Sequence, residues 1–151
     1  MSQIIQLLPP ENIVLDLDAS SKKRVFEKIG LLFENNQGIA SSAVFDSLFA
    51  REKLGSTALG YGIAIPHGRL KHLADTACAF LRLKTPTDFD APDGQPVDLV
   101  FVLLAPAAAS DIHLQILGEL AAMFSDADFR ASLRAAPDAA SLHRLIIEWT
   151  P

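Results

Sequence analysis

The chain has 151 residues, of which half are hydrophobic and 21% are charged, with a net charge of −5 and one cysteine. This composition excludes a disordered chain, and the length fits one domain, residues 1–151, with a sizeable core. The apolar runs are far too short to cross a bilayer, and the first residues lack the pattern of a secretion signal. The basic residues form no continuous stripe of the kind that binds the phosphate backbone of a nucleic acid. Since the lone cysteine also fits a reducing compartment, we expect a cytoplasmic protein with no membrane insertion and no nucleic-acid partner.

Four elements are expected in the first part of the chain. A short strand or turn is expected over residues 3–8, and another short extended segment is expected over residues 14–17. A helix is expected over residues 21–36, because a serine can cap its start and apolar residues recur at the spacing of one buried face. A second helix is expected to begin at the serines 41 and 42 and to end near Gly55.

From Gly60 the pattern changes to strands and then to helices. Three short strands are expected, at residues 63–65, 77–83 and 97–104. The last is an almost continuous apolar run, typical of a central strand covered on both faces, and the prolines and Asp-Gly pair before it indicate a loop. Three helices are expected after it, over residues 110–124, 126–135 and 138–149. The order of elements indicates an α/β fold, a three-layer α/β/α sandwich around a small mixed β-sheet.

His67, in the stretch GIAIPHGRL, is the first candidate functional residue. Pro66 fixes its own backbone and biases Ile65 towards an extended conformation, while Gly68 can take dihedrals closed to other residues. We therefore expect His67 at the carboxyl end of a short strand, on a constrained turn, where α/β sheets often place function. A histidine that merely hydrogen-bonds its own turn is the alternative.

Two further residues would complete a phosphate site with His67. His113 falls in the first turn of a helix capped by Ser110 or Asp111, whose backbone amides favour an anion and disfavour a charged imidazole. Arg51 continues the apolar stripe of its helix and so points along a largely inward face. The alternatives are a polar residue facing water for His113 and a cation stabilising the helix end for Arg51. The combination favours phosphate over metal, because zinc would want further Cys, Asp or Glu ligands, and we expect no metal and no cofactor.

The remaining histidines and the cysteine have simpler explanations. His72 follows Arg69 and Lys71 in a loop and is interpreted as a surface residue, with a partner contact as the alternative. His143 is expected on the solvated flank of the last helix. Cys78 alternates with apolar neighbours in a strand and is interpreted as a small buried hydrophobe.

A longer pattern around His67 resembles a known family. The segment Glu52-x6-Leu59-Gly60-x2-Ile63-Ala64-Ile65-Pro66-His67-Gly68 is similar, without a gap, to the phosphohistidine signature of enzyme IIA proteins of the fructose/mannitol class in the bacterial phosphotransferase system. The resemblance spans nearly the whole chain and is greatest to the nitrogen-regulatory branch. It implies one type-2 IIA domain in which His67 is phosphorylated on Nε2, with Arg51 and His113 assisting the phosphoryl group.

The resemblance also implies partners. A small histidine-type phosphocarrier, loaded from phosphoenolpyruvate through enzyme I, would pass its phosphoryl group to His67. Regulatory targets, such as a sensor kinase or a potassium transporter, would then read the phosphorylation state. Docking is expected at an apolar patch near His67, for which the candidates are Tyr61, Ile63, Leu70 and Leu73, each of which could equally belong to the core. Two other functions stay open: a sugar-specific IIA component that passes the phosphoryl group to a IIB domain, and a small-anion binding domain that forms no covalent bond.

Overall fold

The computed structural model describes residues 4–108 and 111–150 of the chain. The helices are α1 (Ile4–Leu7), α2 (Lys22–Gln37), α3 (Ser41–Glu52), α4 (Asp111–Phe124), α5 (Ala127–Ala135) and α6 (Ala139–Glu148). The strands are β1 (Ile13–Leu17), β2 (Ala58–Gly60), β3 (Ile63–Ala64), β4 (His67–Leu70), β5 (Ala77–Thr87) and β6 (Val97–Pro106). A 3₁₀ turn over Pro10–Asn12 joins α1 to β1. None of the helices within these ranges is long and apolar enough to span a membrane.

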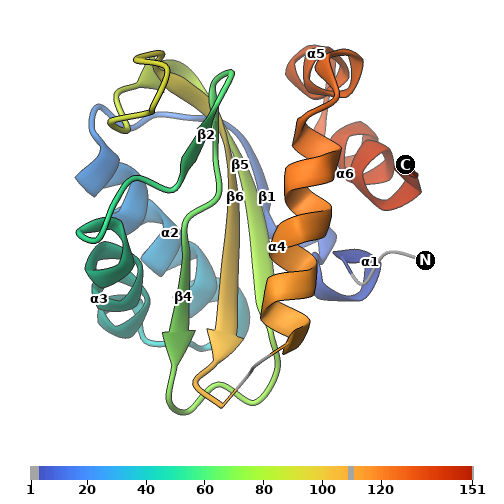
Figure 1. Cartoon of the computed structure of the whole chain (residues 1–151). Helices are drawn as coiled ribbons and strands as arrows, with labels where there is room; N and C mark the ends of the chain where they lie inside the picture. Colours follow the sequence, from blue (N-terminus) through green and yellow to red (C-terminus); the bar gives the residue numbers. More distant parts are fainter. Residues whose placement is uncertain (1–3, 109–110, 151) are drawn as a thin grey trace.

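The elements form three layers, as the sequence predicts. Helices α2 and α3 cover one face of the sheet, and α4, α6 and α1 cover the other, with α5 at one end (Figure 1). Each face has its own apolar core. Phe26, Phe33 and Leu48 pack against one face, while Leu120 and Ile146 pack against the other. The α/β/α sandwich is therefore confirmed.

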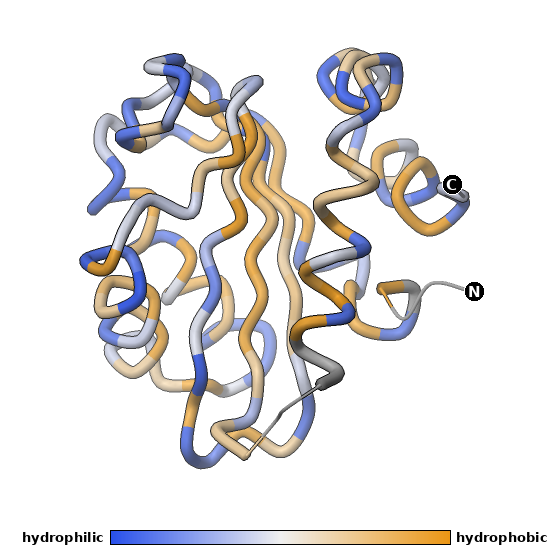
Figure 2. The backbone as a smooth tube through the Cα atoms, viewed as in Figure 1, coloured by the Kyte–Doolittle hydropathy of each residue, from blue (hydrophilic) through white to orange (hydrophobic). Residues whose placement is uncertain are grey.

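The sheet is mixed and is built around β6. Its strand order is β1-β5-β6-β3-β2, and β4 pairs with β6 on the same side as β3. Strand β6 runs antiparallel to β5 and parallel to β3 and β4. Figure 2 shows the hydrophobic colour concentrated in the central strands between the two helical layers. The apolar run predicted as a central strand is therefore central and covered on both faces.

Most predicted helix boundaries are confirmed by their caps. The Ser21 hydroxyl accepts the backbone N–H of Arg24, and Gly38, with φ of 69°, ends α2 in the left-handed conformation. The side chains of Asp126 and Asp138 accept N–H groups at the starts of α5 and α6. Helix α3 begins at Ser41 as expected but ends at Glu52, three residues before Gly55.

The structure differs from the sequence-based prediction at three short elements. The first residues form a helical turn, α1, in which Ile4 and Leu8 are both buried and the Leu8 N–H donates to the Ile4 carbonyl at 3.0 Å. Of the two alternatives, the strand was wrong and the turn is found as one turn of helix, because the i, i+4 spacing of Ile4 and Leu8 buries both together. Strands β2 and β4 were not predicted, since both are short and contain glycine. Strand β2 pairs with the nearby β3, whereas β4 depends on pairing with β6, more than thirty residues further along the chain.

Candidate functional site

His67 lies within a broken strand that runs beside β6. The register pairs Ile63 with Leu99 in β3 and His67 with Leu103 in β4, so the chain keeps its direction across the interruption. Pro66 has no N–H to donate, but its carbonyl accepts the Leu103 N–H at 3.0 Å. The prediction that His67 ends a strand and begins a turn was therefore wrong. His67 is the first residue of β4, because pairing with β6 continues past the proline.

Gly68 is needed for close packing rather than for an unusual backbone conformation. Its φ is not positive, which corrects the expected role of this glycine. A Cβ built on Gly68 would collide with the hydroxyl of Ser47 and would lie 3.2 Å from the Ser47 backbone carbon. The Ser47 hydroxyl also donates to the Arg69 carbonyl at 3.0 Å. Helix α3 thus lies directly against β4 beside His67.

The imidazole of His67 is held in one orientation and kept neutral. Its Nδ1 lies 2.9 Å from the carbonyl oxygen of Ile65, which only accepts, so Nδ1 carries the proton and Nε2 carries the lone pair of the neutral ring. Burial lowers the pKa of the half-buried ring, and the charge of Arg51 lowers it further, against the raising effects of the Ile65 hydrogen bond and of Glu52. The net pKa is below 6.5, so the ring is mainly neutral at pH 7.

Arg51 and His67 face the same pocket. Arg51 lies in the last turn of α3, where its Nη1 donates to the Gly55 carbonyl at 2.9 Å. The pocket has a volume of about 430 Å³. It is lined by Ser47, Ala50, Arg51, Leu54, His67, Gly68, Arg69, Leu114 and Leu117. Helices α3 and α4 therefore form its two sides, with the edge strand β4 between them (Figure 1). Among the described side chains no group of three His, Cys, Asp or Glu is arranged to hold a metal ion.

Glu52 is part of this site, although no role for it followed from the sequence beyond its place in the signature. Its side chain is 3% exposed and accepts from Lys22 Nζ at 3.2 Å. It also accepts the backbone N–H and the hydroxyl of Thr57. These contacts fix the loop between α3 and β2. Because Glu52 follows Arg51 directly, they also fix the end of the helix that carries the arginine.

The second histidine and the helix start beside it are only partly described. Ser110 and the side chains of Asp111 and His113 lie outside the described residues. The backbone of α4 begins at Asp111, and Leu114 lines the pocket that contains His67. The start of α4 is therefore adjacent to the site. The roles expected for His113 and for the backbone amides stay predictions.

The residues predicted to dock a partner are not brought together. Ile63 and Leu70 are 1% and 9% exposed and belong to the two cores. Leu73 is half-buried and lines a different groove. Tyr61 is exposed, but it lies at the β2–β3 turn, six residues and roughly 20 Å of extended chain from His67. There its ring lies 4.4 Å from the guanidinium carbon of Arg130.

Other apolar residues surround the pocket instead. Leu54, which follows α3, is 83% exposed, and Leu114, near the start of α4, is 65% exposed. Both line the pocket that contains His67 and Arg51. Sequence reasoning missed them because Leu54 lies between a lysine and a glycine, while Leu114 continues an apolar helix.

The remaining candidates have structural explanations. His143 is half-buried and its Nε2 lies 2.9 Å from the Leu8 carbonyl, so it ties α6 to the N-terminal turn and is not the solvated residue that was expected. His72 is exposed, as expected. Cys78 is buried, and burial raises the pKa of its thiol, which confirms its interpretation as an inert core residue.

The fold and this pocket agree with a family match. Residues 6–149 match the family described as "Phosphoenolpyruvate-dependent sugar phosphotransferase system, EIIA 2", and the chain belongs to this family. The "Nitrogen regulatory protein" of Pseudomonas aeruginosa is 45% identical over 98% of this chain and 97% of its own length. The crystal structure of the nitrogen regulatory protein IIA-Ntr from Neisseria meningitidis has a TM-score of 0.92 and 47% identity, covering 96% of this chain and 99% of that one.

Sugar-specific relatives are less similar. The fructose-specific EIIA component of Haloferax volcanii is 31% identical over 98% of this chain and 97% of its own length. The match covers nearly the full length of that protein, so the covered length does not distinguish the nitrogen-regulatory branch from the sugar-specific one. The sequence identity does, because it is 45% to the Pseudomonas protein and 31% to the Haloferax protein. The comparisons support the nitrogen-regulatory assignment over the sugar-specific one.

Proposed function

We propose that this chain is a regulatory phosphocarrier of the nitrogen-type phosphotransferase system, which accepts a phosphoryl group on Nε2 of His67. The observation that carries the proposal is the hydrogen bond from Nδ1–H of His67 to the Ile65 carbonyl. It assigns the proton of the neutral ring to Nδ1 and leaves the nucleophilic lone pair on Nε2. The lowered pKa of His67 keeps the ring in this reactive form at neutral pH.

The transfer is an in-line displacement between two imidazoles. The Nε2 lone pair of His67 forms a bond to phosphorus, while the P–N bond of the donor phosphohistidine breaks and its electron pair returns to the donor ring. His67 keeps its Nδ1 proton and so becomes cationic as the new bond forms. The Ile65 carbonyl, which accepts that proton's hydrogen bond, and the nearby charge of Glu52 both stabilise this cation.

Arg51 is proposed to stabilise the phosphoryl oxygens during transfer. One of its five N–H groups is used by the Gly55 carbonyl, which holds the guanidinium in place while other donors are available for the oxygens. Phosphoryl transfer depends mainly on positioning and charge neutralisation, and this arrangement supplies both. His113 and the backbone amides at Ser110 and Asp111 are proposed to assist from the start of α4.

The donor is proposed to be a histidine-type phosphocarrier protein that docks around the pocket. Leu54 and Leu114, on opposite sides of His67, provide the exposed apolar contacts for such a partner. Once His67 is phosphorylated, the pocket contains a group with nearly two negative charges, and regulatory targets would distinguish this state from the bare one. We place the relay in the cytoplasm.

The proposal is tested by intact-protein mass spectrometry. The protein is incubated with phosphoenolpyruvate, enzyme I and the histidine-type carrier, and wild type is compared with His67→Ala and with His72→Ala, which removes an exposed histidine from the surface. One acid-labile phosphoryl adduct is expected on wild type and on His72→Ala. An adduct on His67→Ala would overturn the assignment. Addition of a IIB protein then tests the sugar-transport alternative, since rapid loss of the adduct to IIB would support that alternative.

A further inference from the structure

A second groove lies on the other side of Ser47 and Arg69 from the pocket of His67. We call it the α3–β4 groove. It is formed by the α2–α3 connection, by one face of α3 and by the segment 69–74 that includes the end of β4. Its volume is about 660 Å³, larger than that of the His67 pocket and within the range of small-molecule clefts. Ser47 and Arg69 line both hollows.

The floor of the α3–β4 groove is apolar. Leu70 is almost fully buried beneath it, and Ile39 and Leu73 are half-buried beside it. Ala40 and Ala43 add small side chains that leave the space open. A ligand that lies on this floor would therefore need an apolar body.

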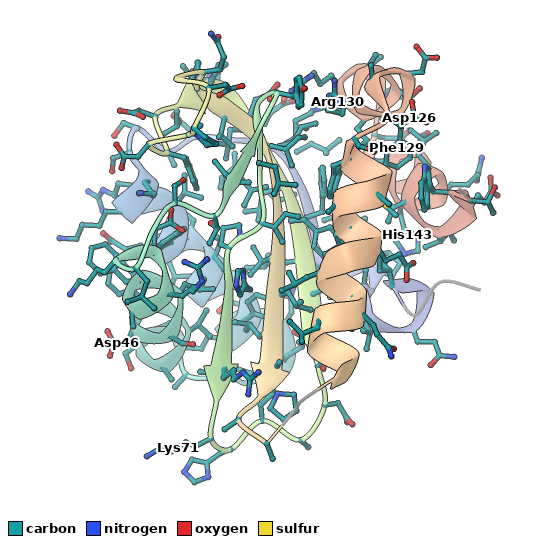
Figure 3. All side chains as sticks on the ribbon, viewed as in Figure 1. Asp46, Lys71, Asp126, Phe129, Arg130 and His143 are labelled. Atoms are coloured by element: carbon teal, nitrogen blue, oxygen red, sulfur yellow. The ribbon has the colours of Figure 1, made fainter. Side chains whose placement is uncertain are left out.

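One wall of the groove is cationic. Arg69 and Lys71, two residues apart, line it with the exposed His72 beside them, in a chain whose net charge is −5. The part of the lining that the structure describes contains no Asp or Glu. Arg69 makes a long contact of 3.5 Å from Nη1 to the Ala107 carbonyl, which leaves other N–H donors available. Figure 3 shows Lys71 extending outward from the end of the molecule where β4 finishes. This wall therefore favours an anionic group.

We propose that the α3–β4 groove binds a small organic acid, with its apolar body on the Leu70 floor and its carboxylate on Arg69 and Lys71. A planar guanidinium pairs with a carboxylate through two parallel hydrogen bonds, and the adjacent lysine adds a second charge. The two cations, Arg69 and Lys71, are only two residues apart, which suits one anionic group better than the extended acidic face of a protein. The site does not include His67, so its occupation does not require phosphorylation.

The proposal is tested with a set of probes that share one apolar body. Indoleacetate is titrated into the ¹⁵N-labelled full chain, followed by tryptophol and tryptamine, which carry a hydroxyl and an ammonium in place of the carboxylate. Saturable amide shifts are expected with indoleacetate in residues 37–43 and 69–74. Tryptophol and tryptamine are expected to bind at least about tenfold more weakly, because they cannot pair with the guanidinium. Equal affinity for the three probes, shifts centred elsewhere or no shifts would overturn the proposal.

Variants separate the groove from general charge effects. The double variant Arg69→Gln/Lys71→Gln is expected to weaken indoleacetate binding by about tenfold or more. The control double variant Lys53→Gln/Lys84→Gln removes two exposed lysines outside the groove and is expected to bind like wild type. Equal weakening in both double variants would contradict the site. Inorganic phosphate at the same concentration is expected to leave the groove amides unshifted, and the same shifts with phosphate alone would contradict the need for an apolar body.

Discussion

Glu52 accepts two hydrogen bonds from Thr57, one from its backbone N–H at 3.1 Å and one from its hydroxyl at 2.7 Å. The same carboxylate pairs with Lys22, which reaches it from the start of α2. A buried carboxylate thus joins the first long helix, the end of α3 and the approach to β2. Because Arg51 is the preceding residue and the charge of Glu52 raises the pKa of His67, this carboxylate is coupled to both residues of the phosphoryl site.

Glu52→Gln is expected to lower the free energy of unfolding by about 1–3 kcal/mol, because it leaves Lys22 with only its exposed partner Asp90 and weakens the hydrogen bonds from Thr57. The pKa of His67 should also fall, since the charge of Glu52 raises it. Urea unfolding and NMR titration measure the two effects. Glu27→Gln, which breaks an exposed pair with Arg24, is the matched control and should cost less than about 0.5 kcal/mol. Equal losses in the two variants would contradict the role of burial.

Arg51→Ala is expected to raise the pKa of His67, because the positive charge of Arg51 lowers it in the native protein. The rate of phosphoryl acceptance should fall by about 100-fold, as for loss of one preorganised donor to developing negative charge. Arg51→Lys keeps the positive charge but not the planar set of N–H donors. The pKa of His67 should therefore stay near its wild-type value while the rate of phosphoryl acceptance still falls. Lys53→Ala, two residues on, removes an exposed cation and serves as the control. An unchanged rate in Arg51→Ala would return this residue to a helix-end role.

The lowered pKa of His67 has a consequence for stability as the pH falls. The unfolded chain binds a proton near pH 6.5 while the folded chain resists it, so the contribution of His67 is complete above pH 6.5 and is lost as the pH falls through the folded pKa. The difference in unfolding free energy between wild type and His67→Gln should therefore shrink on acidification from neutral pH, by at most about 1.4 kcal/mol per pH unit. The other histidines cancel in this difference. A difference that stays constant with pH would show that the pKa is not lowered.

Leu54→Ala and Leu114→Ala are each expected to slow transfer from the carrier about fivefold or more at low acceptor concentration, because each removes apolar area that the carrier would bury on docking. The rate at saturating acceptor should change little. Tyr61→Ala is the comparison, since Tyr61 is just as exposed but lies at the far turn. Slower transfer in Tyr61→Ala, with none in the two leucine variants, would move the docking surface to the β2–β3 turn.

Gly68→Ala is expected to destabilise the fold by about 2–3 kcal/mol, because the new Cβ would overlap Ser47 and force α3 away from β4. Adding Ser47→Gly should recover part of this loss, since it removes the hydroxyl and Cβ that cause the overlap. Gly118→Ala is the control. Gly118 lies in α4 with nothing near its Cβ position, so alanine there should stabilise the protein by about 0.5–1 kcal/mol. Thermal or urea unfolding of the variants measures these effects.

Local pattern and capping predicted most of the fold. The continuous apolar run of β6 and the periodic spacing in α2 need no distant partner to be recognised, and Ser21, Asp126 and Asp138 mark helix starts by their own chemistry. The broken strand was missed because proline and glycine around His67 indicate a turn locally. What keeps this stretch extended is its register with β6, more than thirty residues further along the chain.

The same distinction applies to the site. His67 and Arg51 could be found from residue type and spacing, and the structure places both on one pocket. The docking residues could not be found in this way, because the exposure of a side chain depends on how the helices pack on the sheet. From the sequence, Ile63 and Leu70 could belong either to a docking patch or to the core, and the structure places both in the core. Leu54 and Leu114 line one pocket only because the fold places α3 and α4 on either side of β4.

The pairing of β4 with the central strand β6 also determines how firmly His67, the phosphoryl acceptor, is held in place. The amide of Leu103 in the central strand donates to the carbonyl of Pro66, so releasing His67 from its place requires detaching the edge strand β4 from β6. In hydrogen-exchange experiments the Leu103 amide should therefore exchange only when β4 separates from β6. A partner protein therefore meets an imidazole that is already ordered, and little conformational entropy is lost on the acceptor side when the two proteins associate.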